Sequence, residues 1–200
     1  IGVNWEALLP TLFQPSCGED AFAYGEELIK SGELDVIIFD STSGMIPKSQ
    51  VEGEVGSSSI GKHAMLFSKE MPKINAFVAQ NNVAAIFVSQ FREKIGVMFG
   101  SPETTQAGNA LRFFASNIIE LRRSLEKDGD AVIGLNTKFK VLKCKTAPPY
   151  RTGSFPIVFG KGIDKLEELI DTASELDIIR KFGQTITVWI NKEAKEGDKY

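Results

Sequence analysis

The sequence has little of what disulfide and zinc scaffolds are made from. Its 200 residues include two cysteines, Cys17 and Cys144, and one histidine, His63. The cysteines lie far apart without a Cys-x-x-Cys pair, and a single histidine beside them is too few for a tetrahedral zinc site. A disulfide scaffold needs more cysteines in a shorter chain. We therefore expect free thiols in a reducing compartment, and we interpret His63 as a surface or half-buried helix residue without a catalytic partner.

Long apolar runs and a basic leader are also missing. No run approaches the roughly 18 apolar residues that a membrane-spanning helix needs, and Ile1 to Leu12 carry no basic region of the kind that opens a secretory signal. These absences predict a cytoplasmic protein without a membrane partner. Because the chain starts with Ile1 in an apolar stretch, we interpret it as a fragment or processed piece of a longer protein.

Neither sign of charge is in large excess. The formal net charge is -3, and 42% of the residues are hydrophobic, which fits a globular core and argues against a disordered chain. Without a global basic field, any nucleic-acid binding must come from a local patch or from narrow loops.

Helix and strand patterns alternate up to Gln90. Residues 18–32 have an acidic first turn and a terminal glycine, which predicts a helix. Short apolar runs at 36–39 and 84–90 predict strands covered on both faces, as in a parallel sheet. Between them, residues 62–81 have the apolar spacing of a helix, with an irregularity expected at Pro72.

The second half of the sequence is richer in strands. Its patterns predict strands at 118–122, 138–145, 155–159 and 185–191, turns at 128–130 and 160–162, and a helix at 164–181. This order predicts an α/β fold with a central, mostly parallel sheet, an antiparallel extension and the start of a small α+β domain. We expect the first domain to cover residues 1–164 and the second to cover 165–200.

Two polar residues follow the two apolar strands, Asp40 the first and Gln90 the second. α/β proteins bind ligands at such strand ends, and an Asp after an apolar run helps to hold magnesium in P-loop ATPases. Taken alone, so short a motif more often marks an Asp that caps the next turn. Gln90 could sense a phosphate, but by itself it is better explained as a residue that satisfies backbone groups at the strand end.

The stretch after Gln90 is long and contains several glycines. Its basic residues Arg92 and Lys94 could neutralise phosphates. Its apolar residues could wedge between bases or pack on them; they are Ile95, Val97, Met98 and Phe99. The alternative is a loop folded over the core that buries these side chains, and composition leaves both open.

Basic residues also recur in the strand at 138–145. By strict alternation, Lys138 and Lys140 face one side of the strand, and Lys143 and Lys145 face the other. They form either a solvated face or a clamp for a nucleotide phosphate.

Several of these segments together resemble the RecA recombinase family. The most specific is REKIGVMFGSPETTQAGNALRFFAS at 92–116, which is similar to the family's second DNA-binding loop and the helix after it. LDVIIFDS is similar to the Walker B strand, and FVSQ to the segment that carries the sensor glutamine. IPKSQVEGEVG, KVLKCKTAPPY and FPIVFGKGI also match, in the family's order. The resemblance covers nearly the whole chain and weakens after about Leu176.

The resemblance implies a nucleotide site for ATP and Mg²⁺. Asp40, with Ser41 beside it, would act on Mg²⁺ through water, and Gln90 would sense the γ-phosphate. Further nucleotide-binding residues implied by the matching segments are Lys143, Lys145, Phe159 and Gly160. Of these, the two lysines would reach the ATP of a neighbouring subunit.

The resemblance also implies two DNA-binding loops. The first, at 53–61, would bind through Ser59 and Ile60, with Ile60 as an apolar wedge. The second, at 91–105, would bind with Ile95 as its wedge and through Arg92, Lys94, Ile95, Gly96, Val97, Met98 and Phe99.

Outside the loops, Gly108 and Asn109 would contact DNA phosphates, and Phe113 would pack at the interface between subunits. The chain departs from the family's usual residues at Ala107, at Ser59-Ile60-Gly61 and at Met65. A larger departure is that no GxxxxGK[ST] segment occurs in these residues. The resemblance implies that the family's Walker A loop and its catalytic glutamate lie upstream of these 200 residues, and we assign no catalytic residue.

For the longer protein of which this chain would be a piece, the resemblance implies ATP-dependent homologous recombination and DNA repair, within the SOS response to DNA damage. It would form a head-to-tail filament of its own copies on single-stranded DNA and exchange strands with duplex DNA. One alternative is a truncated, non-hydrolysing DNA-binding or filament-regulating module. Another is a different RecA-fold ATPase, such as a helicase or a clock-type hexamer, against which the KIGVMFG loop argues.

Overall fold

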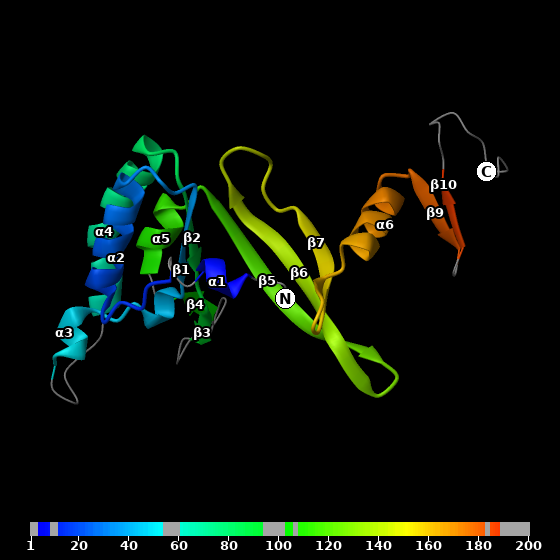
Figure 1. The fold of residues 1–200 in the computed structure, drawn as a ribbon, viewed down its shortest axis with the longest axis horizontal. Coiled ribbons are helices and arrows are strands. Elements are labelled where there is room, and N and C mark those ends of the chain that lie inside the picture. Colours follow the sequence, from blue (N-terminus) through cyan, green and yellow to red (C-terminus); the bar gives the residue numbers. More distant parts are fainter. Residues whose placement is uncertain are drawn as a thin grey trace. The chain divides into compact units, whose positions relative to one another are not determined.

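A computed structural model describes residues 4–8, 12–53, 61–93, 103–105, 108–182 and 185–188. The chain divides into two compact units (Figure 1). Residues 7–116 form one, here called the helical unit, and residues 1–6 with 117–200 form the other, the sheet unit. The fold is mixed α/β, as expected, with a parallel strand pair in the helical unit and a four-stranded antiparallel sheet in the sheet unit.

The helical unit alternates helices and short strands. The short helix α1 (Trp5–Leu8) has residues in both units. The other elements of the helical unit are α2 (Gly18–Lys30), β1 (Val36–Asp40), the 3-10 turn η2 (Thr42–Gly44), α3 (Lys48–Val51), α4 (Lys62–Gln80), β2 (Ala84–Val88), β3 (Phe91–Glu93), β4 (Glu103–Thr105) and α5 (Gly108–Phe114).

Helices α2 and α4 form where the sequence predicts them. In α2 the acidic first turn and the final Lys30 suit the helix dipole, and Gly32 beyond its end takes a φ of +75°, which glycine adopts at little cost. Helix α4 continues through Pro72, so the expected irregularity does not interrupt it. Apolar faces of both helices meet β1 in the core, whose buried members are Ala21, Phe22, Ile29, Phe39, Met45, Leu66, Phe67, Met71, Ile74 and Val83.

Strands β1 and β2 pair in parallel, with Asp40 opposite Val88. One face of the pair packs on the core through the stacked rings of Phe39 and Phe87. The prediction that both faces are covered is wrong for the described residues, because Ile38 and Ile86 on the other face are 60% and 48% exposed. The helices of this unit cover only one side of the pair, while the apolar residues of both strands occupy both sides.

The sheet unit is built on two long strands. Its elements are β5 (Asn117–Asp128), β6 (Ala131–Cys144), β7 (Thr152–Val158), β8 (Gly162–Ile163), α6 (Lys165–Glu175), β9 (Ile179–Phe182) and β10 (Thr185–Val188). The sheet order is β5-β6-β7-β8, and the predicted turn between the first two strands contains Gly129 with a φ of +59°.

Two sequence predictions in this unit are wrong in detail. The helix expected at 164–181 ends at Glu175, because Asp177 takes a left-handed φ of +54° and the chain continues as β9, which pairs with β10. The face assigned to Lys143 is also wrong. A register shift sets Lys143 opposite Ile118, so a β-bulge returns it to the face that Lys138 and Lys140 share.

Candidate functional site

The parallel register brings Asp40 and Gln90 to one edge of the strand pair. Asp40 is the last residue of β1 and lies opposite Val88, the last residue of β2, and Gln90 follows two residues later. Both side chains are exposed. A hydrogen bond of 3.1 Å from the hydroxyl of Thr42 to that of Ser89 joins the two chain segments just beyond the strands. This is the carboxyl edge, where parallel α/β sheets bind ligands.

The groups at this edge fit a nucleotide-bound magnesium ion. Mg²⁺ prefers oxygen ligands, keeps several waters and is usually held by one or two carboxylates together with phosphates. Asp40 would supply the carboxylate, with the Ser41 hydroxyl beside it, and the buried hydroxyl of Ser43 has no hydrogen-bond partner among the described residues. Among the described residues, no group of three His, Cys, Asp or Glu side chains lies close enough together to hold a metal ion. Phosphate oxygens and water would therefore have to complete the coordination of Mg²⁺.

A short hairpin follows Gln90 directly. Strands β3 and β4 pair antiparallel, with Arg92 opposite Thr104. The ends of the expected second loop are therefore strands, and the exposed Arg92 lies on one of them. The other residues proposed for the two loops lie outside the described residues; they are Ser59, Ile60, Lys94, Ile95, Gly96, Val97, Met98 and Phe99.

Helix α5 follows the hairpin in sequence and carries three more of the predicted residues. Gly108 is its first residue, and the neighbouring Asn109 is exposed. Phe113 is 75% exposed and makes an edge-on contact with Phe114, which packs against the core. An exposed phenylalanine next to a core one suits a contact with another protein surface.

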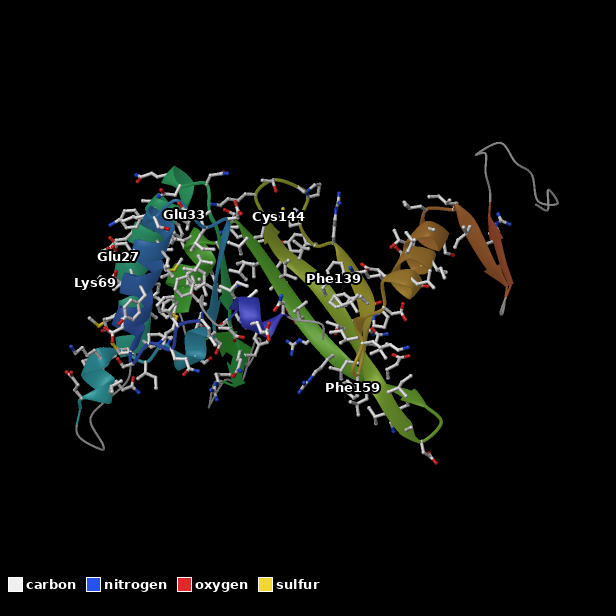
Figure 2. All side chains as sticks on the ribbon, viewed as in Figure 1. Glu27, Glu33, Lys69, Phe139, Cys144 and Phe159 are labelled. Carbon is white, nitrogen blue, oxygen red and sulfur yellow. The ribbon has the colours of Figure 1, made fainter. Side chains whose placement is uncertain are left out.

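The remaining predicted nucleotide residues belong to the sheet unit. Lys143 is half-buried near the end of β6, and Lys145 follows the strand. Phe159 follows β7 and is 54% exposed, and Gly160 has a φ of +78° in the turn before β8. Figure 2 labels Cys144 and Phe159. A hydrogen bond with Thr146 lowers the pKa of the Cys144 thiol, whereas burial raises the pKa of the Cys17 thiol.

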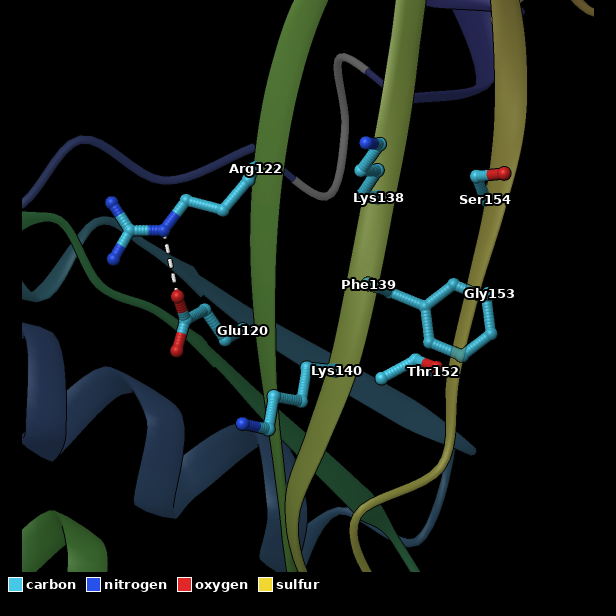
Figure 3. Close-up of a pocket in the computed structure, with 8 residues that line it drawn as sticks. All are labelled: Glu120, Arg122, Lys138, Phe139, Lys140, Thr152, Gly153 and Ser154. Carbon is cyan, nitrogen blue, oxygen red and sulfur yellow. Dashed lines mark hydrogen bonds and ion pairs between the residues drawn. The ribbon is translucent and has the colours of Figure 1, made fainter.

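A shallow cavity of about 330 Å³ lies over the basic face of the sheet unit (Figure 3). Two cross-strand pairs of β5 and β6 line it, Glu120 with Lys140 and Arg122 with Lys138. The remaining lining residues are Phe139, Thr152, Gly153 and Ser154. The side chain of Arg122 bonds that of Glu120 at 2.6 Å. The sequence indicated the lysines and Arg122 as basic residues, but only the strand register shows that they share one cavity.

Among the described residues, no helix combines the length and the apolar character needed to cross a membrane.

Comparison with known proteins gives consistent matches over most of the chain. The model of the RecA N-terminal domain family matches residues 1–164. The chain is similar to Protein RecA of Porphyromonas gingivalis, with 47% identity over 92% of this chain and 54% of that protein. It is 45% identical to Protein RecA of Bacillus subtilis over 92% of this chain and 52% of that protein. The chain thus spans about half the length of the curated relatives it matches.

Proposed function

The chain belongs to the RecA family, and we propose that it serves in ATP-dependent homologous recombination and DNA repair. In this proposal the complete gene product assembles head to tail on single-stranded DNA, in the cytoplasm. It pairs that strand with homologous duplex DNA and takes part in the response to DNA damage. Residues 1–164 belong to the ATPase and DNA-binding core, and residues 165–200 begin a C-terminal domain.

One observation carries the proposal: the carboxyl edge of β1 and β2 leads straight into the β3–β4 hairpin. Asp40 and Gln90 lie at that edge, and β3 begins with Phe91, the residue after Gln90. A nucleotide that displaces the backbone at Gln90 would therefore act directly on the first residue of the hairpin. This arrangement suits a site in which nucleotide binding controls a DNA-binding segment.

At the nucleotide site, Asp40 would hold a water ligand of Mg²⁺, with Ser41 beside it. When bound, ATP with Mg²⁺ supplies a triphosphate whose γ-phosphate differs between the states before and after hydrolysis. Gln90 would donate its amide N–H to that phosphate. Phe159 and Gly160 would also bind nucleotide, and Lys143 and Lys145 would reach the ATP of a neighbouring subunit in the filament.

On the DNA side, Arg92 would neutralise a phosphate of single-stranded DNA from strand β3. The segments at 53–61 and 94–102 would complete the contacts, with Ile60 and Ile95 as apolar wedges between bases. Gly108 and Asn109 would bind further phosphates. Such contacts read no sequence, so the choice of the homologous duplex would be left to base pairing.

The cavity of the sheet unit suits a second stretch of phosphate backbone. Arg122, Lys138 and Lys140 line it, and the bulge places Lys143 on the same sheet face. Three lining cations and a single lining carboxylate, Glu120, leave the cavity net positive on a chain whose overall charge is -3. A polyanion would be attracted to this face locally.

A direct test is the binding of a labelled oligothymidine to the complete gene product, followed by fluorescence anisotropy with and without a slowly hydrolysed ATP analogue. The proposal expects tighter DNA binding with the analogue and a loss of that effect in Gln90→Ala. Equal DNA binding with and without the nucleotide would contradict it.

A second candidate function has one observation in its favour. The 200 residues contain no GxxxxGK[ST] segment, so this stretch could act as a DNA-binding or filament-regulating module that does not hydrolyse ATP. DNA binding by the complete gene product without any DNA-stimulated ATP hydrolysis would support this candidate over the first.

A further inference from the structure

The only histidine in the sequence joins the first turn of α4 to the carboxyl edge of β1 and β2. His63 is the second residue of α4, and its Nε2 lies 2.8 Å from the carbonyl oxygen of Thr42. Because a carbonyl oxygen can only accept, Nε2 must carry the proton. The orientation of the His63 ring is also held by stacking, because its centroid lies 5.0 Å from that of the Phe67 ring.

Thr42 uses its polar groups on both sides of this junction. It is fully buried, its hydroxyl donates to the Ser89 hydroxyl at 3.1 Å, and its carbonyl oxygen accepts from His63. A buried threonine with satisfied polar groups has little freedom to move without breaking one of these bonds. Thr42 is therefore a rigid link between its two partners.

The three residues occupy positions that matter for the proposed function. Thr42 comes two residues after Asp40, and Ser89 comes immediately before Gln90. His63 lies two residues after Gly61, the N-cap of α4, whose φ of +79° sets the direction in which the chain enters the helix. The side-chain bond from His63 to Thr42 ties the first turn of α4 to the strand ends.

We propose that His63 is a positioning residue that couples nucleotide binding at Asp40 and Gln90 to the orientation of the first turn of α4. A displacement of the backbone at Gln90 moves Ser89, and the Ser89–Thr42 bond transmits the shift to the carbonyl that His63 holds. The first turn of α4 then changes its orientation. The start of this helix, which directly follows the segment proposed as the first DNA loop, shifts with it. This inference rests on the proposed function, since it needs both a nucleotide and a DNA ligand.

The coupling between two sites is the ratio of the affinities for one ligand measured with and without the other. This ratio can be measured separately from the stability of the fold. The experiment uses the complete gene product and measures how much a slowly hydrolysed ATP analogue tightens binding of a labelled oligothymidine. We compare His63→Ala, which removes the donor, with His63→Gln, whose amide nitrogen can occupy the place of Nε2. Lys69→Ala is the matched control, because Lys69 is an exposed residue of the same helix. Melting curves accompany each variant.

We expect His63→Ala to reduce the nucleotide-induced tightening of DNA binding by about five- to tenfold. Its affinity for DNA without nucleotide should stay within about twofold of that of the unsubstituted protein. His63→Gln should restore most of the effect, and Lys69→Ala should retain it. Full tightening in His63→Ala overturns the inference. An equal loss of DNA affinity with and without nucleotide also overturns it, because that loss would reflect a structural role alone.

Failure of the proposed function has a different signature. If the unsubstituted protein binds DNA equally with and without the nucleotide, the nucleotide–DNA coupling itself is absent and the inference falls with it. A second readout needs no ligand. Nitrogen-15 NMR of the His63 ring in the 200-residue chain should show the Nε2-protonated tautomer, and its signal is directly assignable because no other histidine is present. An Nδ1-protonated ring would contradict the bond on which the inference depends.

Discussion

The rings of Phe39 and Phe87 stack with their centroids 4.6 Å apart and their planes 5° from parallel. This pair lies on the core face of the β1–β2 strand pair, and its neighbour Phe22 adds a third ring at 5.8 Å from Phe39. Aromatic packing therefore holds together the two strands whose ends carry Asp40 and Gln90.

Phe39→Ala should destabilise the 200-residue chain by about 3–5 kcal/mol, because it empties a packed aromatic site. Ile38→Ala, in the same strand but 60% exposed on the opposite face, should cost less than about 1 kcal/mol. Urea unfolding followed by circular dichroism measures both. Similar losses for the two variants would show that the exposed face is also packed.

The two thiols should differ in reactivity. Near neutral pH, Cys144 should be alkylated by iodoacetamide at least several times faster than Cys17, because its pKa is lowered while Cys17 is buried and its pKa is raised. Peptide mapping by mass spectrometry gives the two rates.

Thr146→Val is the test of the cause, since Thr146 is the hydrogen-bond partner that lowers the Cys144 pKa. The variant should slow Cys144 labelling near neutral pH and leave it unchanged at a pH well above the thiol pKa, where the thiolate is fully formed. Faster labelling of Cys17 than of Cys144 in the parent chain would refute the account.

The purified 200 residues should show no DNA-stimulated ATP hydrolysis. The printed sequence has no GxxxxGK[ST] segment to hold the phosphates, and the carboxylate of Asp40 cannot replace one. A coupled phosphate-release assay checks this. Steady turnover that Asp40→Ala abolishes would mean that the chain assembles an ATPase site from other residues.

The sequence predicted most elements through local signals. An acidic first turn and a terminal glycine located α2, and short apolar runs followed by Asp40 and Gln90 located the carboxyl edge. The failures arose where a single backbone angle or the register between strands decides the structure. The amphipathic pattern at 164–181 did not reveal that Asp177 ends the helix, and strict alternation could not anticipate the bulge that turns Lys143.

The partners of His63 were equally beyond sequence reasoning. The carbonyl of Thr42 that it binds lies 21 residues away along the chain, and no local pattern marks such a contact. The basic cavity needed the register of β5 with β6 and of β6 with β7. The sequence could name His63 and the basic residues, but not the residues that they contact in the fold.

The central claim is that the segment after Gln90 binds the backbone of single-stranded DNA. Its most direct test is a titration of labelled oligothymidine at several salt concentrations with the complete gene product, Arg92→Ala and the control Lys69→Ala. Arg92→Ala should weaken binding to all sequences and reduce the slope of log affinity against log salt by about 0.7 to 1, the share of one phosphate contact, while Lys69→Ala leaves the slope unchanged. An unchanged slope in Arg92→Ala, or an equal change in Lys69→Ala, would contradict the account.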